Sequence, residues 1–254
     1  MQKLRDVADK FGLSLYPLLD DGHQLLKVAV KEDQVEMVAY LLRKKAKVYS
    51  NGNVLSLLQI ATMNNNTIIF KMLLEHGAEI SNDSIHYNKS LIKLAVEHNN
   101  TEIARLIVEH KNFGKEYDQS LLRRAVKKNN LEMVSLLLET GADVDEYDDN
   151  GFAPIHHAVK ARNDDILQLL LDYGADINAK NKYGNTSFSM VLKHSRDVTY
   201  RSDIDEVHIH GITKSSKLAI LLDNDADIND LDYRRCFSSN VRYDYLSLAD
   251  LESL

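Results

Sequence analysis

The stretch LLLDYGADINAKN, residues 169–181, is nearly repeated as LLDNDADIN at residues 221–229. Three related stretches occur earlier in the chain: LLRKKAKV from Leu41, LLEHGAEI from Leu73 and LLETGADV from Leu137. A fourth, degenerate version is IARLIVEHKNF from Ile103. A second motif lies upstream of these stretches, as LLKVAV, LLQIAT, LIKLAV, LLRRAV and PIHHAV, and its alanines are 32, 34, 30 and 33 residues apart. The chain is therefore a repeat array with a period of about 33 residues.

Each period predicts two short helices. The second motif opens the first helix, and the apolar spacing of Ile166, Leu169 and Leu170 is typical of the second. Gly174 then ends the second helix in the left-handed conformation of a C-cap. A helix pair of this size cannot bury its own apolar face, so neighbouring pairs must stack into a continuous core.

The unit DNGFAPIHHAVKARNDDILQLLLDYGADINAK, residues 149–180, closely resembles an ankyrin repeat. Gly151 occupies the turn, Pro154-Ile155-His156 the TPLH position and Gly174-Ala175-Asp176 the GAD position. The resemblance covers residues 20–229 as about six units and implies an all-α ankyrin-repeat solenoid with hairpin fingers. Residues 1–19 and 230–254 are expected to be an N-terminal helical cap and a C-terminal cap or tail.

Five of the six units are degenerate at the TPLH histidine. Its place is taken by Lys27, Gln59, Lys93, Arg123 and Ser189. Because the family's histidine hydrogen-bonds to backbone in the turns, we expect lower local stability in the first four units. The sixth unit also carries an insertion near residues 197–216, which we expect to leave the solenoid as a loop.

Composition excludes several functional classes. A net charge of −7 argues against general nucleic-acid binding, which needs concentrated Lys and Arg. No apolar run has the length of a membrane span, and a single cysteine allows no internal disulfide. We therefore expect a soluble monomer in the cytoplasm or the nucleus.

Motifs for catalysis are not found. The sequence contains no nucleophile elbow, phosphate-binding glycine loop, HExxH or CxxC pattern. His208 and His210, near Asp203, Asp205 and Glu206, leave a metal site in the insertion as an alternative. The preferred interpretation is a non-enzymatic protein without cofactors.

The ankyrin resemblance implies that a protein partner binds on the concave face, built from the first helices and the finger tips. Lysines align at the exposed positions of three successive first helices, so an acidic or extended partner segment is expected there. Aromatic residues near the finger tips are candidate interface anchors. The candidate partner-binding residues are Tyr117, Arg123, Arg124, Lys127, Lys128, Phe152, Lys160, Tyr183 and Lys193.

Two further expectations come from the resemblance alone. The irregular repeat style is similar to that of ankyrin proteins of poxviruses and other large DNA viruses, which implies modulation of host signalling or defence. A ubiquitin-ligase substrate adaptor is the alternative, although the tail after Asp230 has no convincing F-box pattern. Asn178 and Asn229, each eight residues after a leucine, resemble targets of asparaginyl hydroxylation.

Overall fold

The structure is a computed structural model that describes residues 22–48, 56–80, 91–110, 120–161, 163–194, 198–201, 206–209 and 216–227. The segments expected to be terminal caps, residues 1–19 and 230–254, lie outside the described residues. The chain divides into two compact units, Met1–Asp118 and Gln119–Leu254. Within the described ranges, each helix is too short or too polar to span a lipid bilayer.

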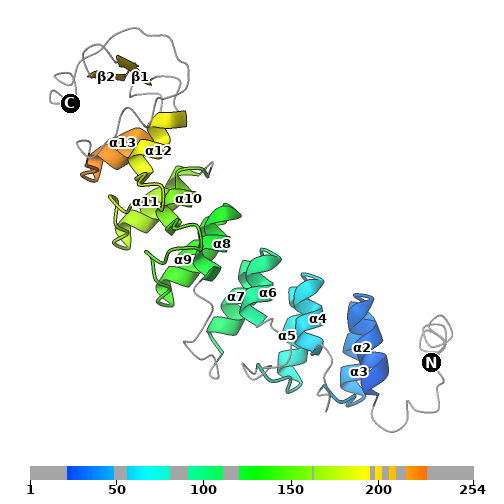
Figure 1. Ribbon diagram of the computed structural model, residues 1–254. Coiled ribbons are helices and arrows are strands. Elements are labelled where there is room, and N and C mark those ends of the chain that lie inside the picture. The colour runs from blue at the N-terminus through cyan, green and yellow to red at the C-terminus, as the bar shows by residue number, and fades with distance from the viewer. Residues whose placement is uncertain are drawn as a thin grey trace. The chain divides into compact units, whose positions relative to one another are not determined.

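The described part of the first unit contains three helix pairs in two layers (Figure 1). The helices are α2 (His23–Lys31), α3 (Val35–Arg43), α4 (Leu57–Met63), α5 (Thr67–Glu75), α6 (Leu91–Glu97) and α7 (Thr101–Val108). Each first helix packs on the second helix of its own pair. In addition, α4 contacts both α2 and α6, and α5 contacts both α3 and α7.

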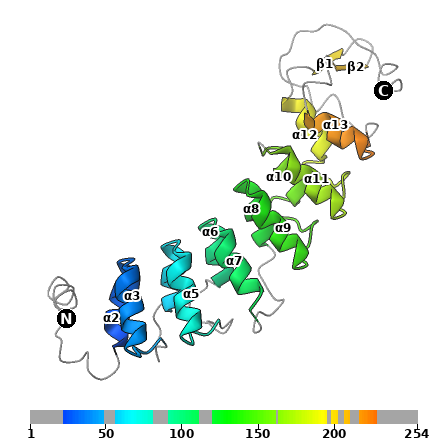
Figure 2. The ribbon, with the colours of Figure 1, turned by 180° about the vertical axis from the view of Figure 1, so that it is seen from behind.

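The second unit repeats this arrangement, as Figure 2 shows from behind. Its helices are α8 (Ser120–Lys127), α9 (Leu131–Glu139), α10 (Pro154–Ala158), α11 (Asp164–Asp172), α12 (Ser187–His194) and α13 (Ser216–Asp223). One layer is α8, α10 and α12, and the other is α9, α11 and α13. The predicted all-α architecture of stacked helix pairs is therefore confirmed.

The insertion of the sixth unit differs from the predicted loop. It contains two antiparallel strands, β1 (Val198–Arg201) and β2 (Glu206–Ile209), in which Val198 pairs with Ile209 and Thr199 with His208. Helix α13 resumes the repeat directly after the insertion. The Lys217 ammonium donates to the carbonyl oxygens of Val159, at 3.1 Å, and Ala161, at the end of α10. This contact holds α13 in register with the preceding pair.

The repeated leucines and alanines make the core. Leu26, Leu58, Leu94 and Leu122 of the first helices are fully buried. The alanines of the same helices, Ala29, Ala61, Ala95 and Ala125, are buried too. Burying one leucine side chain contributes about 1.5–3 kcal/mol, so the stacked leucines account for much of the stability of each unit.

Asparagines organise the turn between the two helices of a pair. The side-chain oxygens of Asn66, Asn100 and Asn130 accept hydrogen bonds from the backbone N–H groups of Ile69, Ile103 and Met133. These are N-caps of the second helices, each typically worth about 1 kcal/mol. The cap amides also reach the preceding repeat: Asn66 donates to Asp33, and Asn100 donates to Asn65. The turns of the first unit are thereby joined by a ladder of side chains.

The second helices α3, α5, α9, α11 and α13 are each followed by a residue with a left-handed backbone. Gly77, Gly141 and Gly174 have φ of 89°, 91° and 84° there, as predicted for Gly174. Lys45 and Asp225 occupy the same position in the first and last pairs, with φ of 62° and 61°. A side chain at positive φ is disfavoured, so these two helix ends carry local strain.

The TPLH position shows how the degenerate units compensate. The imidazole of His156 accepts a hydrogen bond from the Ala153 N–H and contacts the carbonyl oxygens of Ala179, at 3.0 Å, and Asn185. In the second pair, Gln59 and Ser56 form a capping box through reciprocal hydrogen bonds of 2.8 and 3.2 Å. Ser56 and Gln59 therefore supply turn hydrogen bonds in this unit although the histidine is absent, and the expected lower local stability stays a prediction.

Candidate protein-binding surface

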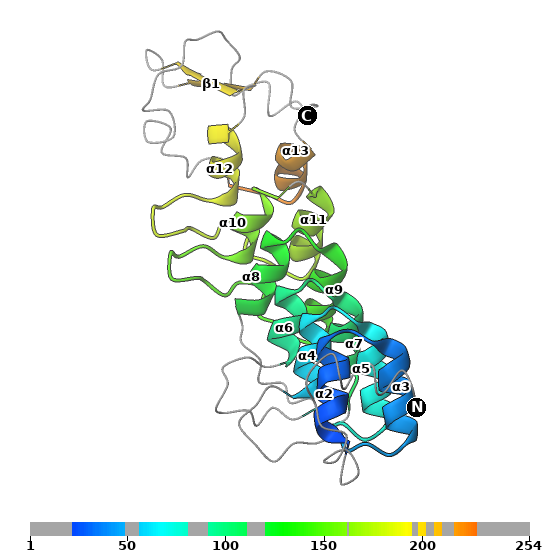
Figure 3. The same cartoon turned by 90° about the vertical axis from the view of Figure 1, so that its right-hand side faces the viewer.

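Two long fingers of the second unit project on the side of α8 and α10 (Figure 3). The first finger comprises residues 140–153 and the second residues 173–186. Their tips have the same turn: Asp148 accepts hydrogen bonds from the N–H groups of Asn150 and Phe152, and Asn181 accepts from those of Tyr183 and Asn185. The acidic or amide side chain at this position therefore fixes the shape of each tip.

The fingers lie close together at Gly151. This residue has φ of 68°, and a Cβ atom there would lie 2.8 Å from the backbone nitrogen of Lys182 in the second finger. A side chain at this position would push the fingers apart. Gly151 thus sets the spacing between Phe152 and Tyr183.

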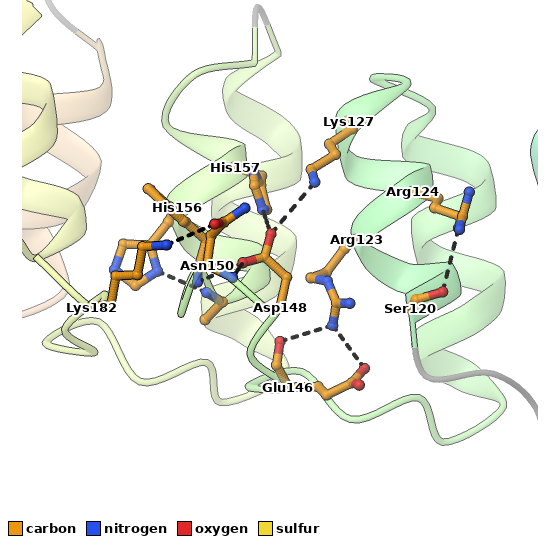
Figure 4. Close-up of polar contacts among 12 residues, drawn as sticks. Ser120, Arg123, Arg124, Lys127, Glu146, Asp148, Asn150, His156, His157 and Lys182 are labelled. Carbon is orange, nitrogen blue, oxygen red and sulfur yellow. Dashed lines mark hydrogen bonds and ion pairs between the residues drawn. The ribbon is translucent and has the colours of Figure 1, made fainter.

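A charged network links α8, the first finger and α10 (Figure 4). Asp148 Oδ2 lies 3.1 Å from His157 Nε2 and 3.6 Å from Lys127 Nζ. Burial alone would raise the pKa of Asp148, but hydrogen bonds from Phe152, His157 and Asn150 outweigh it and lower the pKa to about 2. Burial lowers the pKa of His157 to about 4, and the nearby Lys127 charge acts in the same direction. At neutral pH a neutral His157 therefore donates to a carboxylate.

This network corrects one feature of the predicted basic stripe. The first finger carries several acidic residues between positions 143 and 149, and one of them, Asp148, lies beside Lys127. The Lys127 side chain nevertheless remains 52% exposed. Its charge is partly compensated, and the exposed Lys128 and Lys160 carry more of the positive potential.

Arg123 is a second correction. It was predicted to contact a partner, but its side chain is only 12% exposed and lies 3.1 Å from the Glu146 carboxylate. Arg123 also donates to the carbonyl oxygen of Glu146, which lies 23 residues further along the chain. His156 contacts the carbonyl oxygen of Ala179 at the same separation of 23 residues. Arg123 therefore substitutes for the TPLH histidine and supports the first finger.

The aromatic residues of the fingers form a cluster with lysines. Phe152 is half-buried, and its ring centroid lies 6.2 Å from that of Tyr183 in an edge-to-face arrangement. The Lys160 ammonium lies 4.9 Å from the Phe152 centroid, and the Lys182 ammonium 5.2 Å from that of Tyr183. Tyr183 is 58% exposed. We call Lys127, Lys128, Phe152, Lys160, Lys182 and Tyr183 the lysine–aromatic surface.

The remaining candidates are distributed as follows. Arg124 is exposed on α8, where its Nε donates to Ser120 at 3.3 Å. Tyr117 lies outside the described residues, as does the side chain of Lys193 on α12. Lys182 was not among the partner-binding residues predicted from the sequence. Its position next to Tyr183 at the finger tip could have indicated it.

Asn178 is exposed at the base of the second finger, while Asn229 lies outside the described residues. The Asn178 side-chain oxygen accepts a hydrogen bond from the Asp227 N–H, and Asp145 accepts one from Asp176 at the equivalent place. Asn178 therefore joins the second finger to the residues that follow α13. Its hydroxylation stays a prediction.

The insertion was the place proposed for a metal site. Among the residues that the structure describes, no group of three or more His, Cys, Asp or Glu side chains could hold a metal ion. His208 lies on β2, and His210 falls outside the described ranges.

Comparison with known proteins identifies the family. A family model for ankyrin repeats (3 copies) matches residues 26–120 and 92–181, which together span more than half of the chain. The chain is an ankyrin-repeat protein. No curated protein sequence matches it significantly. Members of this family are typically non-enzymatic and mediate binding between proteins.

Solved ankyrin structures have the same fold. The ankyrin repeat domain of Bcl-3, a member of the IkappaB protein family, is 25% identical, with 69% of this chain and 82% of that chain covered and a TM-score of 0.52. The ankyrin repeat protein EF0377 is 28% identical, with 64% and 87% covered and a TM-score of 0.51. An ankyrin repeat domain from Acinetobacter baumannii AYE, 23% identical with 78% and 96% covered and a TM-score of 0.55, supports the fold alone.

Proposed function

We propose that this ankyrin-repeat protein is a non-enzymatic binding module and that its lysine–aromatic surface captures an acidic, extended segment of a partner protein. The observation that carries the proposal is the pairing of exposed Tyr183 with Phe152 and two lysine ammonium groups. Because the Tyr183 ring is exposed and lysine ammonium groups lie beside the aromatic rings, this surface suits a partner segment with both apolar and acidic side chains.

The physical argument rests on two kinds of contact. Aromatic rings bury a large area at low conformational cost and are common binding hot spots. Carboxylates of a partner would meet the ammonium groups of Lys128, Lys160 and Lys182, which speeds association and selects against basic segments. The finger tips are already held by Asp148, Asn181 and Gly151, so little ordering is needed on binding.

The setting of this activity is proposed from the style of the repeats and from the net charge. The resemblance in repeat style supports a viral or intracellular-pathogen protein that acts on host signalling, as a monomer in the cytoplasm or the nucleus. The negative net charge supports a protein partner over nucleic acid.

An affinity pull-down with mass spectrometry tests the proposal. Wild-type protein is compared with Tyr183→Ser and with a matched control, Tyr173→Ser, which removes a tyrosine that is 43% exposed at the end of α11. We expect a partner with an acidic segment that is lost from Tyr183→Ser and kept by Tyr173→Ser. Equal recovery from all three baits, or partners rich in basic segments, would exclude this surface.

A further inference from the structure

A second surface feature lies in the first unit, at the turn between α4 and α5. Met63, the last residue of α4, is 41% exposed, and Ile68, the second residue of α5, is 58% exposed. Among the described residues these are two of five large apolar side chains left so exposed, and both border the same turn.

The first, third, fourth and fifth repeats carry charged residues at these two positions. Met63 comes two residues after the alanine of its first-helix motif. The residues at the same position of the other motifs are Lys31, Glu97, Lys127 and Lys160. Ile68 lies two residues after the N-cap of its helix, and the residues at this position of the second helices in those four repeats are Glu36, Glu102, Glu132 and Asp165. One repeat has therefore exchanged both charged surface positions for apolar ones, and neither residue contributes to the buried core.

The turn between Met63 and Ile68 is held rigidly. The Asn64 side chain donates to the carbonyl oxygens of Val30 and Lys31, and Asn66 donates to Asp33. On the other side, Asn100 of the third pair donates to Asn65. The two apolar side chains are thus presented from a fixed backbone between the turns of the two neighbouring repeats.

The surroundings of this turn are acidic. The turns of the two neighbouring repeats, with the helix ends that border them, carry five carboxylates and one ammonium group, and the Lys71 ammonium of α5 is already paired with Glu102 at 2.8 Å. The carboxylates are Glu32, Asp33, Glu36, Glu97 and Glu102, and the ammonium groups are Lys31 and Lys71. Met63 and Ile68 can contact an apolar side chain of a partner, and the carboxylates around them can attract basic residues on either side of it.

We infer that Met63 and Ile68 form a second docking surface, which takes a partner segment that presents a large apolar side chain between Lys or Arg residues. This segment differs in charge from the acidic one proposed for the lysine–aromatic surface. The two surfaces lie in different units, so either proposal can fail alone.

A displayed library of random dodecapeptides, selected against the whole chain, tests this inference. The variant Met63→Lys with Ile68→Glu places residues found at the same positions of other repeats, so it should fold as the wild type does, which circular dichroism checks. Tyr173→Ser is the matched control for loss of an exposed apolar side chain. We expect selected peptides that carry an apolar residue with basic flanks and bind the double variant at least about tenfold more weakly, with the control unchanged.

Three results would overturn the inference. Selection could give no peptide of this composition, or such peptides could bind the double variant as tightly as the wild type. Sedimentation could instead show a dimer that the double variant abolishes, in which case the occupant is a second copy of the chain.

Discussion

The guanidinium of Arg123 donates to the backbone carbonyl of Glu146 at 3.4 Å and lies 3.1 Å from its carboxylate. Glu146 Oε2 is otherwise buried without a hydrogen-bond partner. Arg123→Ala would leave the buried Oε2 of this partly exposed carboxylate without its cation, so we expect the free energy of unfolding to fall by about 1–2 kcal/mol. Arg124→Ala, on the exposed side of α8, should change it by less than about 0.5 kcal/mol. Urea denaturation of both variants checks this, and identical curves would refute a structural role for Arg123.

The left-handed backbone of Lys45 predicts a substitution that raises the free energy of unfolding. Lys45→Gly relieves the strain at φ of 62° but adds freedom to the unfolded chain, and the net gain should be about 0.5–1 kcal/mol. Lys44→Gly, one residue earlier at φ of −83°, has no strain to relieve and should destabilise the protein. Thermal melting of the two variants decides the matter, and a loss of stability in both would show that Lys45 is unstrained.

The half-buried pair Asp148 and His157 predicts a pH dependence. The pKa of His157 is about 4 in the folded protein, below the ordinary 6.5, so the unfolded chain binds a proton first. The free energy of unfolding should therefore decline as the pH falls from 6.5 to 4. The pKa of Asp148, about 2 against an ordinary 3.8, adds stability above pH 3.8 that is lost as the pH falls towards 2.

Urea denaturation at pH 7 and pH 4.5 measures the histidine contribution. His157→Gln should reduce the difference between the two pH values, whereas His76→Gln, at an exposed position of the first unit, should leave it unchanged. An unaltered difference in His157→Gln would show that other groups cause it.

The insertion of the sixth unit is predicted to be dispensable, provided that Lys217 is kept. Replacing residues 198–213 by a short Gly-Ser linker should preserve helicity, because α12 and α13 pack on α10 and α11 through their own side chains. Lys217→Met should instead destabilise the second unit by about 1–2 kcal/mol, since it removes donors to Val159 and Ala161 and a contact with Asp164 at 3.7 Å. Circular dichroism with thermal melting checks both variants, and a collapse of helicity in the deletion would mean that the insertion belongs to the core.

Much of the fold could be predicted from the sequence because its main signals are local. The leucine and alanine spacing gave the helix pairs, and Gly174 gave a helix end that the structure confirms at φ of 84°. The asparagine pairs Asn65-Asn66, Asn99-Asn100 and Asn129-Asn130 were an equally regular signal that was missed. In each pair the first residue has φ of 57° or 58° and the second caps the next helix.

The candidate site was less accessible to sequence reasoning because its contacts join residues far apart in the chain. Only its place at the TPLH histidine position distinguishes Arg123, which supports a finger, from the exposed Arg124, and the partner of Arg123 lies 23 residues further along the chain. Likewise, Asp148 compensates Lys127 from 21 positions away, across a finger whose path only the structure gives. A charge pattern along a helix therefore predicted where cations lie but not which of them are available to a partner.

The most direct measurement of the central proposal is the affinity of the captured partner across a range of salt concentrations. Lys128→Glu with Lys160→Glu is compared with wild type and with Lys44→Glu plus Lys45→Glu, an equal charge change on exposed lysines of the first unit. Isothermal titration should give a dissociation constant raised at least about tenfold for the first variant, with a weaker dependence on salt, and little change for the control. Wild-type affinity in Lys128→Glu with Lys160→Glu, or an equal loss in the control, would contradict capture by the lysine–aromatic surface.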